Sequence, residues 1–266
     1  MRPIMHQYLF FIGNFPIRLY GIFFSLGIIS GCITAYFLLK KDRRGWESHM
    51  FDLGLVIAFA GIVGGRLWDV FFFDWEYYHN HLLEIPYIWQ GGMAIQGGII
   101  FACIAAYFYL KKHQIPVLPF ADTVTPGIIL GQAIGRIANF MNGDAFGHPT
   151  GQDFGLLYPD TTLAYHTYGA QPLWPAEVWE CQGDLLIFVL LLWYGCKTRA
   201  EGTTFCLYIM FYSLLRFFLE NYRGDYGTLA LGLKSAQLTS LAAFAGAFIL
   251  FLYFHFKHKS KSGISE

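Results

Sequence analysis

The segment IRLYGIFFSLGIISGCITAYFLLKKDRR, residues 17–44, is an apolar run followed directly by a basic cluster. A bilayer core of about 30 Å needs about 20 apolar residues in a helix, and the run is long enough. The pattern recurs along the chain. Seven stretches satisfy the length requirement: 17–39, 51–73, 92–110, 120–141, 174–196, 203–221 and 236–256. The sequence therefore predicts an all-α membrane protein with about seven transmembrane helices.

The composition extends this prediction to the whole chain. Of the 266 residues, 55% are hydrophobic and only 14% are charged, whereas ordinary soluble domains carry about 25% charged residues. The net charge is zero, which argues against nucleic acid as a partner. The N-terminus lacks the basic, apolar and small-residue regions of a cleavable signal peptide. We expect one polytopic membrane domain over residues 1–266.

Basic residues predict the orientation of these helices. Clusters follow the first, third, fifth and seventh predicted spans, and the opposite loops hold almost none. The clustered residues are Lys40, Lys41, Arg43, Arg44, Lys111, Lys112, Lys197, Arg199, Lys257, Lys259 and Lys261. The positive-inside rule then places these loops and the tail 257–266 in the cytoplasm, with the N-terminus outside.

The longest connection on the outer side, residues 143–173, is rich in Gly, Pro, Asp and Thr. This composition is typical of turns and short strands rather than of another helix. We expect it to form a small extracytoplasmic head region.

Ionisable residues within spans indicate a functional site, because each is costly unless it is paired or hydrated. The fourth span ends in GRIANFMNGDAFG, residues 135–147, where Arg136 and Asn139 share a helix face and Asn142 and Asp144 follow. A guanidinium offers planar, bidentate donors that suit a phosphate or carboxylate. Alternatively, Arg136 simply extends to the outer interface with Asp144 as its partner.

The sixth span contains YSLLRFFLENYRGD, residues 212–225. Tyr212, Arg216 and Glu220 recur every four residues and form one polar stripe, which Arg223 and Asp225 continue. This stripe is either part of a binding site or an Arg–Glu pair that neutralises itself.

Two further stretches carry polar residues at a similar predicted depth. Arg66 and Asp69 in the second span form either part of a site or an internal ion pair. The third span opens with GGMAIQGG, residues 91–98, in which Gln96 precedes Gly97 and Gly98. Such glycines indicate tight helix packing or close approach of a substrate. Together, the polar residues predict a pocket for an anionic lipid head group in the outer leaflet.

These motifs resemble a known family. GRIANFMNGDAFG resembles the signature of the bacterial prolipoprotein diacylglyceryl transferases, which runs Gly-Arg-x-Gly/Ala-Asn-Phe-x-Asn-x-Glu and then Gly. The blocks RLYG, GGR, GGMAIQGG, WPAEVWE and YSLLRFFLENYR resemble further family blocks in the same order. The resemblance covers nearly the whole chain and implies seven spans. It departs at two positions: Asp144 replaces the usual Glu, and Gln96 replaces a His that is often proposed as the catalytic base.

The resemblance implies a transferase that moves the diacylglyceryl group of phosphatidylglycerol to the lipobox cysteine of exported preprolipoproteins and releases glycerol phosphate. This is the first step of bacterial lipoprotein modification. The other partners expected are membrane lipids, and no metal or organic cofactor is expected. The residues expected to take part in catalysis are Arg136, Arg216, Asn139, Asp144, Glu220 and Tyr20. The residues expected to bind substrate are Arg136, Arg216, Gln96, Gly97, Gly98, Asn142, Arg66, Tyr212 and Arg223.

The proton acceptor for the thiol remains open, because Gln cannot act as a base at neutral pH. Asp144 and Glu220 are the candidates by elimination. Otherwise the family His is dispensable, or the chain is a divergent copy with altered activity. A non-enzymatic protein that binds anionic lipids would show the same arginines. A transporter would show inverted repeats, and an intramembrane protease would show paired catalytic residues. The sequence shows neither of these last two patterns.

Overall fold

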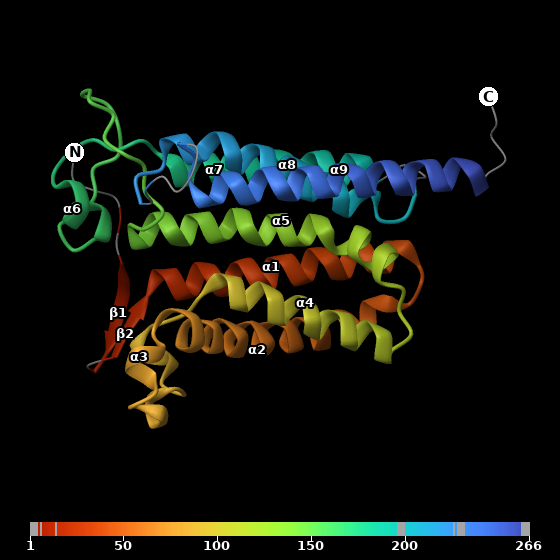
Figure 1. Ribbon diagram of the computed structural model, residues 1–266, viewed down its shortest axis with the longest axis horizontal. Coiled ribbons are helices and arrows are strands. Elements are labelled where there is room, and N and C mark those ends of the chain that lie inside the picture. The colour runs from red at the N-terminus through yellow and green to blue at the C-terminus, as the bar shows by residue number, and fades with distance from the viewer. Residues whose placement is uncertain are drawn as a thin grey trace. The chain divides into compact units, whose positions relative to one another are not determined.

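The computed structural model describes residues 5, 7–13, 15–195, 200–225, 227 and 232–261, and most of these are helical (Figure 1). The strands and α-helices are β1 (Tyr8–Ile12), β2 (Phe15–Arg18), α1 (Leu19–Asp42), α2 (Met50–Trp68), α3 (Trp75–Tyr78), α4 (Ile95–Lys112), α5 (Val117–Asn142), α6 (Leu163–Tyr168), α7 (Ala176–Gly195), α8 (Thr203–Leu219) and α9 (Ser235–Lys261). The remaining helical turns are η1 (Trp46–His49), η2 (Asp69–Phe73), η3 (Leu82–Glu84), η4 (Ile88–Gln90) and η5 (Glu220–Tyr222).

Five helices in the described part of the chain are long and apolar enough to cross a membrane. They are Leu19–Asp42, Trp46–Phe73, Val117–Asn142, Thr203–Tyr222 and Ser235–Ser260. The chain is therefore a helical, multi-pass membrane protein. The helices α4 and α7 occupy the predicted third and fifth spans, but both carry polar residues, so the count of seven spans stays a prediction. Cys196, Lys197 and Arg199 of the fifth segment, and residues 262–266 of the tail, lie outside the described residues.

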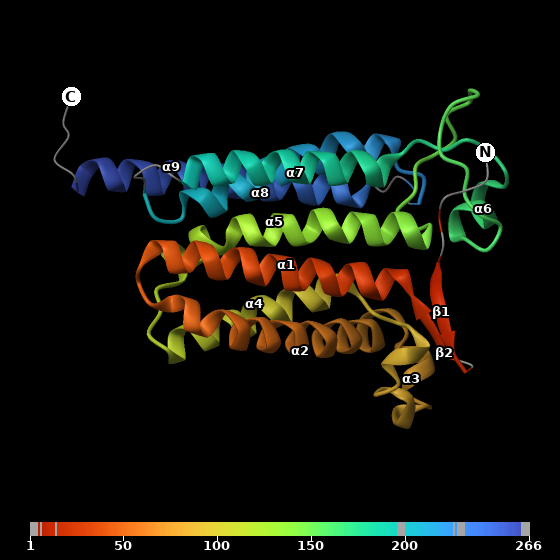
Figure 2. The same cartoon turned by 180° about the vertical axis from the view of Figure 1, so that it is seen from behind.

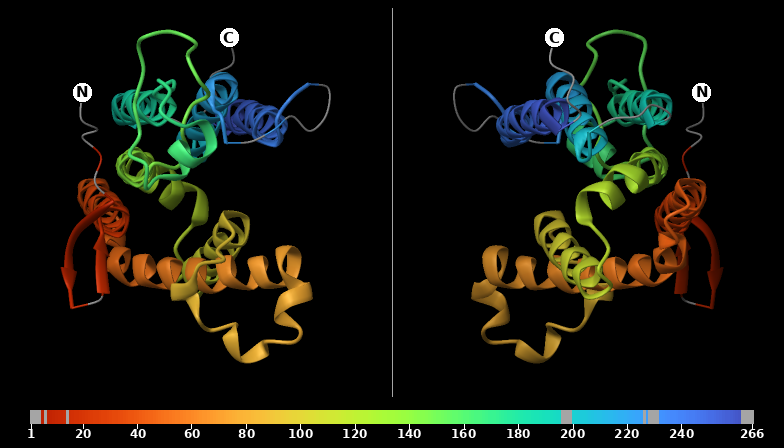
Figure 3. Two further views of the ribbon diagram at one scale, coloured as in Figure 1. Left: turned by 90° about the vertical axis from the view of Figure 1, so that its left-hand side faces the viewer. Right: turned by 90° about the vertical axis from the view of Figure 1, so that its right-hand side faces the viewer.

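The helices belong to two units, which are described separately. Unit 1 comprises Met1–Leu38 and Ala121–Glu266, and unit 2 comprises Leu39–Phe120. In unit 1, α8 lies between α7 and α9 (Figure 3). Ile129 of α5 and the α7 residues Ile187 and Leu191 form a buried apolar cluster, against which Leu207 and Phe211 of α8 pack. These contacts hold the three helices whose ends carry the predicted site.

Glycines bring α1 and α5 of unit 1 into direct backbone contact. A Cβ atom added at Gly31 would lie 2.7 Å from the carbonyl oxygen of Gly127, and one at Gly27 would lie 2.8 Å from that of Gly131. Such small residues allow membrane helices to approach closely. Gly135, four residues after Gly131 on α5, takes no part in this contact, because nothing lies within 4 Å of a Cβ at Gly135.

An antiparallel hairpin precedes the first long helix, and the sequence analysis did not anticipate it. β1 pairs with β2, and α1 begins at Leu19, directly after β2 (Figure 2). The predicted span therefore starts two residues too early, because residues 17 and 18 are extended. The Gly-Asn dipeptide at positions 13 and 14, between two apolar runs of the sequence, is the signal that was available.

The connection 143–173 contains isolated bridges and one short helix. Pro149 and Leu156 each form an isolated bridge with Leu173, and these bridges do not extend into the short strands that were predicted. The expectation that no helix forms here was wrong, because α6 spans six residues. Thr162 starts this helix by accepting a hydrogen bond from the backbone N–H of Tyr165 at 3.3 Å, which is ordinary N-terminal capping.

In unit 2, α2 packs tightly against α4 through the glycines of both helices. A Cβ at Gly97 would lie 2.2 Å from the carbonyl oxygen of Gly64, and a Cβ at Gly98 would lie 3.3 Å from that of Gly61. Of the two roles considered for Gly97 and Gly98, the structure shows helix packing.

Substitution at the α1–α5 contact should destabilise the protein. We expect Gly31→Leu to lower the free energy of unfolding by about 1–3 kcal/mol or more, because the new side chain forces the two backbones apart. Thermal unfolding in detergent measures the effect. Gly246→Leu in α9 is the matched control, since nothing lies within 4 Å of a Cβ there. Equal melting temperatures for the two variants would contradict the contact.

Candidate active site

Helix α7 carries a buried acidic face. Glu177, Glu180 and Asp184 are spaced three and four residues apart, so they lie on one side of the helix. All three are buried, whereas Leu186, Val189 and Trp193 of the same helix are exposed. An apolar helix that turns three carboxyl groups inward needs cations from its neighbours, because buried charges are stable only when paired.

Glu180 receives those cations from two neighbouring segments. Its Oε2 atom lies 3.0 Å from Nη1 of Arg136 on α5 and 3.4 Å from Nη1 of Arg223. Its Oε1 atom accepts a hydrogen bond from Nη1 of Arg216 on α8. One carboxylate therefore joins three guanidinium groups from two segments that lie far apart in the sequence. We call Glu180 and these three arginines the Glu180 cluster.

The arginines have further partners that orient them. Nη2 of Arg136 donates to the hydroxyl oxygen of Tyr212 at 3.2 Å. Nη2 of Arg216 lies 2.8 Å from Oε2 of Glu220, which is the ion pair expected from their spacing. Nε of Arg223 donates to Oδ1 of Asp225 at 3.0 Å. Arg136 pairs with Glu180, so it does not depend on Asp144 for a counter-charge, contrary to the alternative considered from the sequence.

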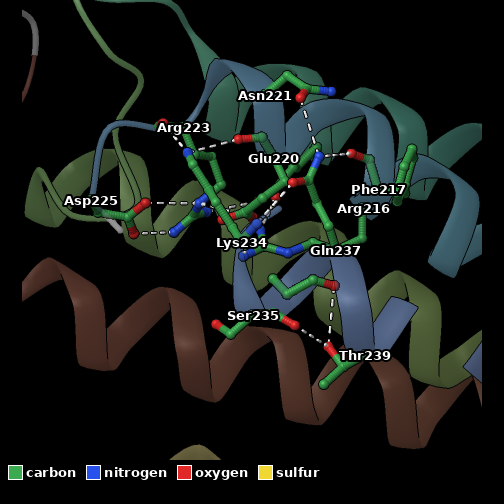
Figure 4. Close-up of polar contacts among 12 residues, drawn as sticks. Arg216, Phe217, Glu220, Asn221, Arg223, Asp225, Lys234, Ser235, Gln237 and Thr239 are labelled. Carbon is green, nitrogen blue, oxygen red and sulfur yellow. Dashed lines mark hydrogen bonds and ion pairs between the residues drawn. The ribbon is translucent and has the colours of Figure 1, made fainter. Parts of the chain in front are cut away.

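The start of α9 closes the cluster from another side (Figure 4). Nζ of Lys234 donates to the backbone carbonyl oxygens of Glu220 at 2.9 Å and of Arg223 at 2.6 Å. The Gln237 amide donates to Asn221 Oδ1 at 3.1 Å. These contacts fix the chain where it leaves α8, which keeps Arg223 directed at Glu180.

Burial changes the acid–base behaviour of groups at this end of the unit. Burial lowers the pKa of Lys234. Burial also lowers the pKa of Arg223, but the Glu180 and Asp225 carboxylates raise it more, so its pKa stays above the ordinary value. Burial and then the Glu177 carboxylate raise the pKa of Tyr158, whose hydroxyl donates a hydrogen bond to Glu177. Arg223 therefore remains charged and Tyr158 remains neutral.

A second polar group forms where α5 ends. Asp144 accepts hydrogen bonds from the side-chain amides of Asn139 at 2.8 Å and Asn142 at 2.9 Å. The turn that brings Asp144 back over the helix uses positive φ angles at Gly143 (73°) and Ala145 (60°). Tyr20 of α1 interacts electrostatically with both Asp144 and Arg136. The spacing of the two amides and the acid in this motif thus builds one hydrogen-bonded group.

Gly147 ends this motif for a steric reason. A Cβ at this position would lie 2.2 Å from the carbonyl oxygen of Trp174, which immediately precedes α7. Only glycine lets the connection 143–173 approach the start of α7 this closely. Gly147 also forms an isolated bridge with Arg223. The motif is therefore attached directly to the Glu180 cluster.

The comparison with known proteins decides the family. A family sequence model described as prolipoprotein diacylglyceryl transferase matches residues 7–253. The chain belongs to this family. Its relatives include three enzymes named phosphatidylglycerol–prolipoprotein diacylglyceryl transferase. That of Clostridium botulinum (strain Langeland) is 35% identical over 238 residues, which are 89% of this chain and 92% of the relative.

The other two relatives match over a similar length. The Staphylococcus saprophyticus enzyme is 36% identical over 236 residues, which are 87% of this chain and 83% of the relative. The Halalkalibacterium halodurans enzyme is 33% identical over 245 residues, which are 91% of this chain and 84% of the relative. The likeness extends over nearly the whole diacylglyceryl transferase chain, in agreement with the resemblance seen in its motifs.

Within this transferase, unit 1 brings most of the predicted site residues together. Arg136, Tyr212, Arg216, Glu220 and Arg223 surround Glu180, and Tyr20 lies beside the group formed by Asn139, Asn142 and Asp144. Glu180 was the residue missing from the prediction. Its position as the last residue of WPAEVWE, three residues after Glu177 and four before Asp184, was the available signal.

The remaining predicted residues, Arg66, Gln96, Gly97 and Gly98, belong to unit 2 of the transferase. Arg66 is occupied by backbone carbonyls: its guanidinium donates to Ile85 O at 2.7 Å, Gly91 O at 2.7 Å and Glu84 O at 3.0 Å. Its expected partner Asp69 is 4.0 Å away. Gln96 is the second residue of α4. In the described structure Arg66 thus shapes the loop between α2 and α4.

Removal of the shared carboxylate should destabilise the transferase strongly. We expect Glu180→Gln to cost about 3–5 kcal/mol of folding free energy, because three buried guanidinium groups lose a common counter-charge. Thermal unfolding in detergent measures the loss. Asp225→Asn, which affects only Arg223, should cost less. A Glu180 variant as stable as the Asp225 variant would show that the cluster does not depend on Glu180.

Proposed function

We propose that this chain transfers the diacylglyceryl group of phosphatidylglycerol to the lipobox cysteine thiol of an exported preprolipoprotein. Glycerol phosphate is the second product. The names of the relatives support the two substrates. The arginine-rich cluster in apolar helices supports a lipid substrate with an anionic head group, since guanidinium groups bind phosphate through paired donors.

The observation that carries the proposal is the unequal exposure of the arginines that share Glu180. The side chains of Arg136 and Arg216 are 18% and 15% exposed, whereas that of Arg223 is 4% exposed. A phosphate can reach the first two arginines without dismantling the cluster. We therefore assign Arg136 and Arg216 as phosphate ligands. Arg223 and Glu220 hold these arginines and Glu180 in position.

The chemistry needs a stabilised leaving group. The sulfur of the substrate cysteine attacks the glycerol carbon that carries the phosphate, and the bond between that carbon and the phosphate oxygen breaks. Negative charge grows on the departing phosphate. Arg136 and Arg216, already oriented by Tyr212, Glu180 and Glu220, stabilise this charge without reorganisation.

The thiol proton needs an acceptor, and Asp144 is the better of the two carboxylates considered. Glu220 is fully buried and paired with Arg216. Asp144 is partly exposed, interacts with Tyr20 and is oriented by Asn139 and Asn142. An ordinary thiol is already a few per cent ionised at neutral pH, and nearby arginines increase this fraction. A weak base is therefore sufficient, and a His at position 96 is not required.

The membrane arrangement completes the proposal. We place the chain in the bacterial inner membrane with seven spans, a single polytopic domain, the N-terminus outside and the tail 257–266 in the cytoplasm. The connection 143–173 then forms an extracytoplasmic head. Support comes from the alternation of basic residues. The two acyl chains of the lipid enter sideways between helices. Gln96, Gly97, Gly98, Asn142 and Arg66 remain proposed contributors to substrate binding, Arg66 through the loop that it holds.

Loss of either phosphate ligand should abolish the reaction. We expect Arg136→Ala and Arg216→Ala each to slow transfer by about 10²-fold or more, because each removes a preorganised cation from the developing charge. The assay follows diacylglyceryl transfer from phosphatidylglycerol to a lipobox peptide in detergent, together with glycerol phosphate release. Arg44→Ala, which removes an arginine paired with Asp42 in unit 2, is the control. Full activity in Arg136→Ala or Arg216→Ala contradicts the assignment of these arginines as phosphate ligands. Lipid binding without turnover by the unaltered protein contradicts the enzymatic function.

Restoration of the family residue tests the assignment of the base. We expect Gln96→His to change the transfer rate by less than about tenfold, because Asp144 already serves as the base. If the new His instead supplied a missing general base, the rate would rise by about 10²–10⁴-fold. The same assay measures the rate. A rise in the higher range would show that position 96 supplies the base in a fully active site and that Asp144 does not.

A further inference from the structure

Asp184 differs from every other carboxyl group around the Glu180 cluster. It lies one helical turn after Glu180 on α7 and is fully buried. Neither of its oxygen atoms has a hydrogen-bond or ion-pair partner among the residues that the structure describes. The Glu220 carboxylate also lacks hydrogen bonds, but it forms ion pairs with Arg216 and Arg223. The arginines pair instead with Glu180, Glu220 and Asp225, and Glu177 accepts a hydrogen bond from Tyr158.

The surroundings of Asp184 are partly charged and partly apolar. Arg136 from α5, Arg216 from α8, and Glu180 and Cys181 from α7 itself interact with it electrostatically. One turn further along α7, Ile187 belongs to the apolar cluster formed with Ile129 and Leu191. Asp184 therefore lies at the boundary between the arginines and the hydrophobic core.

The charge balance of the site limits which carboxyl groups are ionised. In the described structure, four cationic side chains gather here with five carboxyl groups. The cations are Arg136, Arg216, Arg223 and Lys234, and the carboxyl groups are those of Glu177, Glu180, Asp184, Glu220 and Asp225. With every group ionised the net charge would be negative, which would repel a phosphodiester. A buried carboxylate that has neither a hydrogen bond nor an ion pair costs the most free energy to ionise. Among these groups, Asp184 is that carboxylate.

We infer that Asp184 is uncharged when the phosphate of the lipid binds, and that ionised Asp184 competes with the phosphate for Arg136. The inference rests on the proposed function, because it concerns the same phosphate ligand. Asp184 acts through Arg136 and does not touch the substrate, so it is a positioning residue. Its neutral form leaves Arg136 available to the lipid, and its carboxylate draws Arg136 inward along α7.

Binding of phosphatidylglycerol should therefore weaken as the pH rises. We expect the Kd of short-chain phosphatidylglycerol, measured by titration calorimetry without peptide, to increase at least tenfold between about pH 6 and about pH 9. The phosphodiester and the arginines do not titrate in this range. Asp184→Asn keeps the shape of the side chain but cannot ionise. The Kd of this variant for the lipid should therefore stay constant with pH and equal the low-pH Kd of the unaltered protein.

Two matched variants separate Asp184 from its neighbours. Asp184→Glu restores an ionisable group and should restore the pH dependence. Glu177→Gln removes another buried carboxyl group of α7 and should leave the pH dependence as in the unaltered protein. The melting temperature in detergent identifies variants that have not folded. Short-chain diacylglycerol, which carries no phosphate, should show no such dependence.

The outcomes distinguish this inference from the proposed function. A constant Kd in the unaltered protein, pH dependence that persists in Asp184→Asn, or loss of binding by folded Asp184→Asn at every pH would each overturn the role of Asp184. Failure of the unaltered protein to transfer the diacylglyceryl group to a lipobox peptide, with pH-dependent lipid binding intact, would overturn the proposed function alone.

Discussion

The arrangement of the candidate active site in unit 1 depends on one carboxylate that is shared by three guanidinium groups. A single buried ion pair in an apolar bundle gains little, because desolvation offsets most of the attraction. Glu180 changes that balance by accepting Arg136, Arg216 and Arg223 together. Arg136 comes from α5, and Arg216 and Arg223 come from α8 and the turn after it, so the carboxylate determines how the ends of α5, α7 and α8 meet.

The same arrangement explains why the family motif is built as it is. The amides of Asn139 and Asn142 hold Asp144 above the end of α5, and Gly147 lets the chain touch Trp174. Phe146, Tyr158 and Leu173 then form a small apolar cluster in the connection that follows. The hydroxyl of Tyr158 reaches Glu177, one turn from Glu180. The connection 143–173 is thus attached to the acidic face of α7 through the hydrogen bond of Tyr158.

The sequence predicted the long apolar helices, and it predicted that several polar side chains would lie close together, because both depend on local patterns. Apolar length located the five long helices, and the spacing of Arg216 and Glu220 made their ion pair one of the two alternatives. The role of Glu180 could not be predicted in the same way, since its partners lie 44, 36 and 43 residues away in the chain. The alternative that paired Arg136 with Asp144 was wrong for this reason: Asp144 is close in sequence, but it accepts hydrogen bonds from Asn139 and Asn142 instead.

Other misses have equally physical causes. The β1–β2 hairpin was hidden because its residues are as apolar as those of the helix that follows. Arg66 was grouped with the site on predicted depth alone, whereas its guanidinium is held by backbone carbonyls of its own unit. The glycines beside Gln96 allowed two interpretations, and only the α2–α4 contact distances distinguish them.

The order of the helices along the chain has a consequence for biosynthesis. Arg136 precedes Glu180 in the sequence, and Arg216 and Arg223 follow it. When α7 leaves the ribosome and enters the bilayer, the first of its counter-ions is therefore already there. The remaining two arginines arrive with the next segment, whose own insertion is eased by an acid already in place. Likewise Asp122, near the start of α5, is synthesised long before Gly202 and Phe205. The backbone N–H groups of these two residues, at the start of α8, donate hydrogen bonds to the Asp122 carboxylate. Assembly from the N-terminus onward thus gives the later polar group of each pair a partner that is already in the membrane.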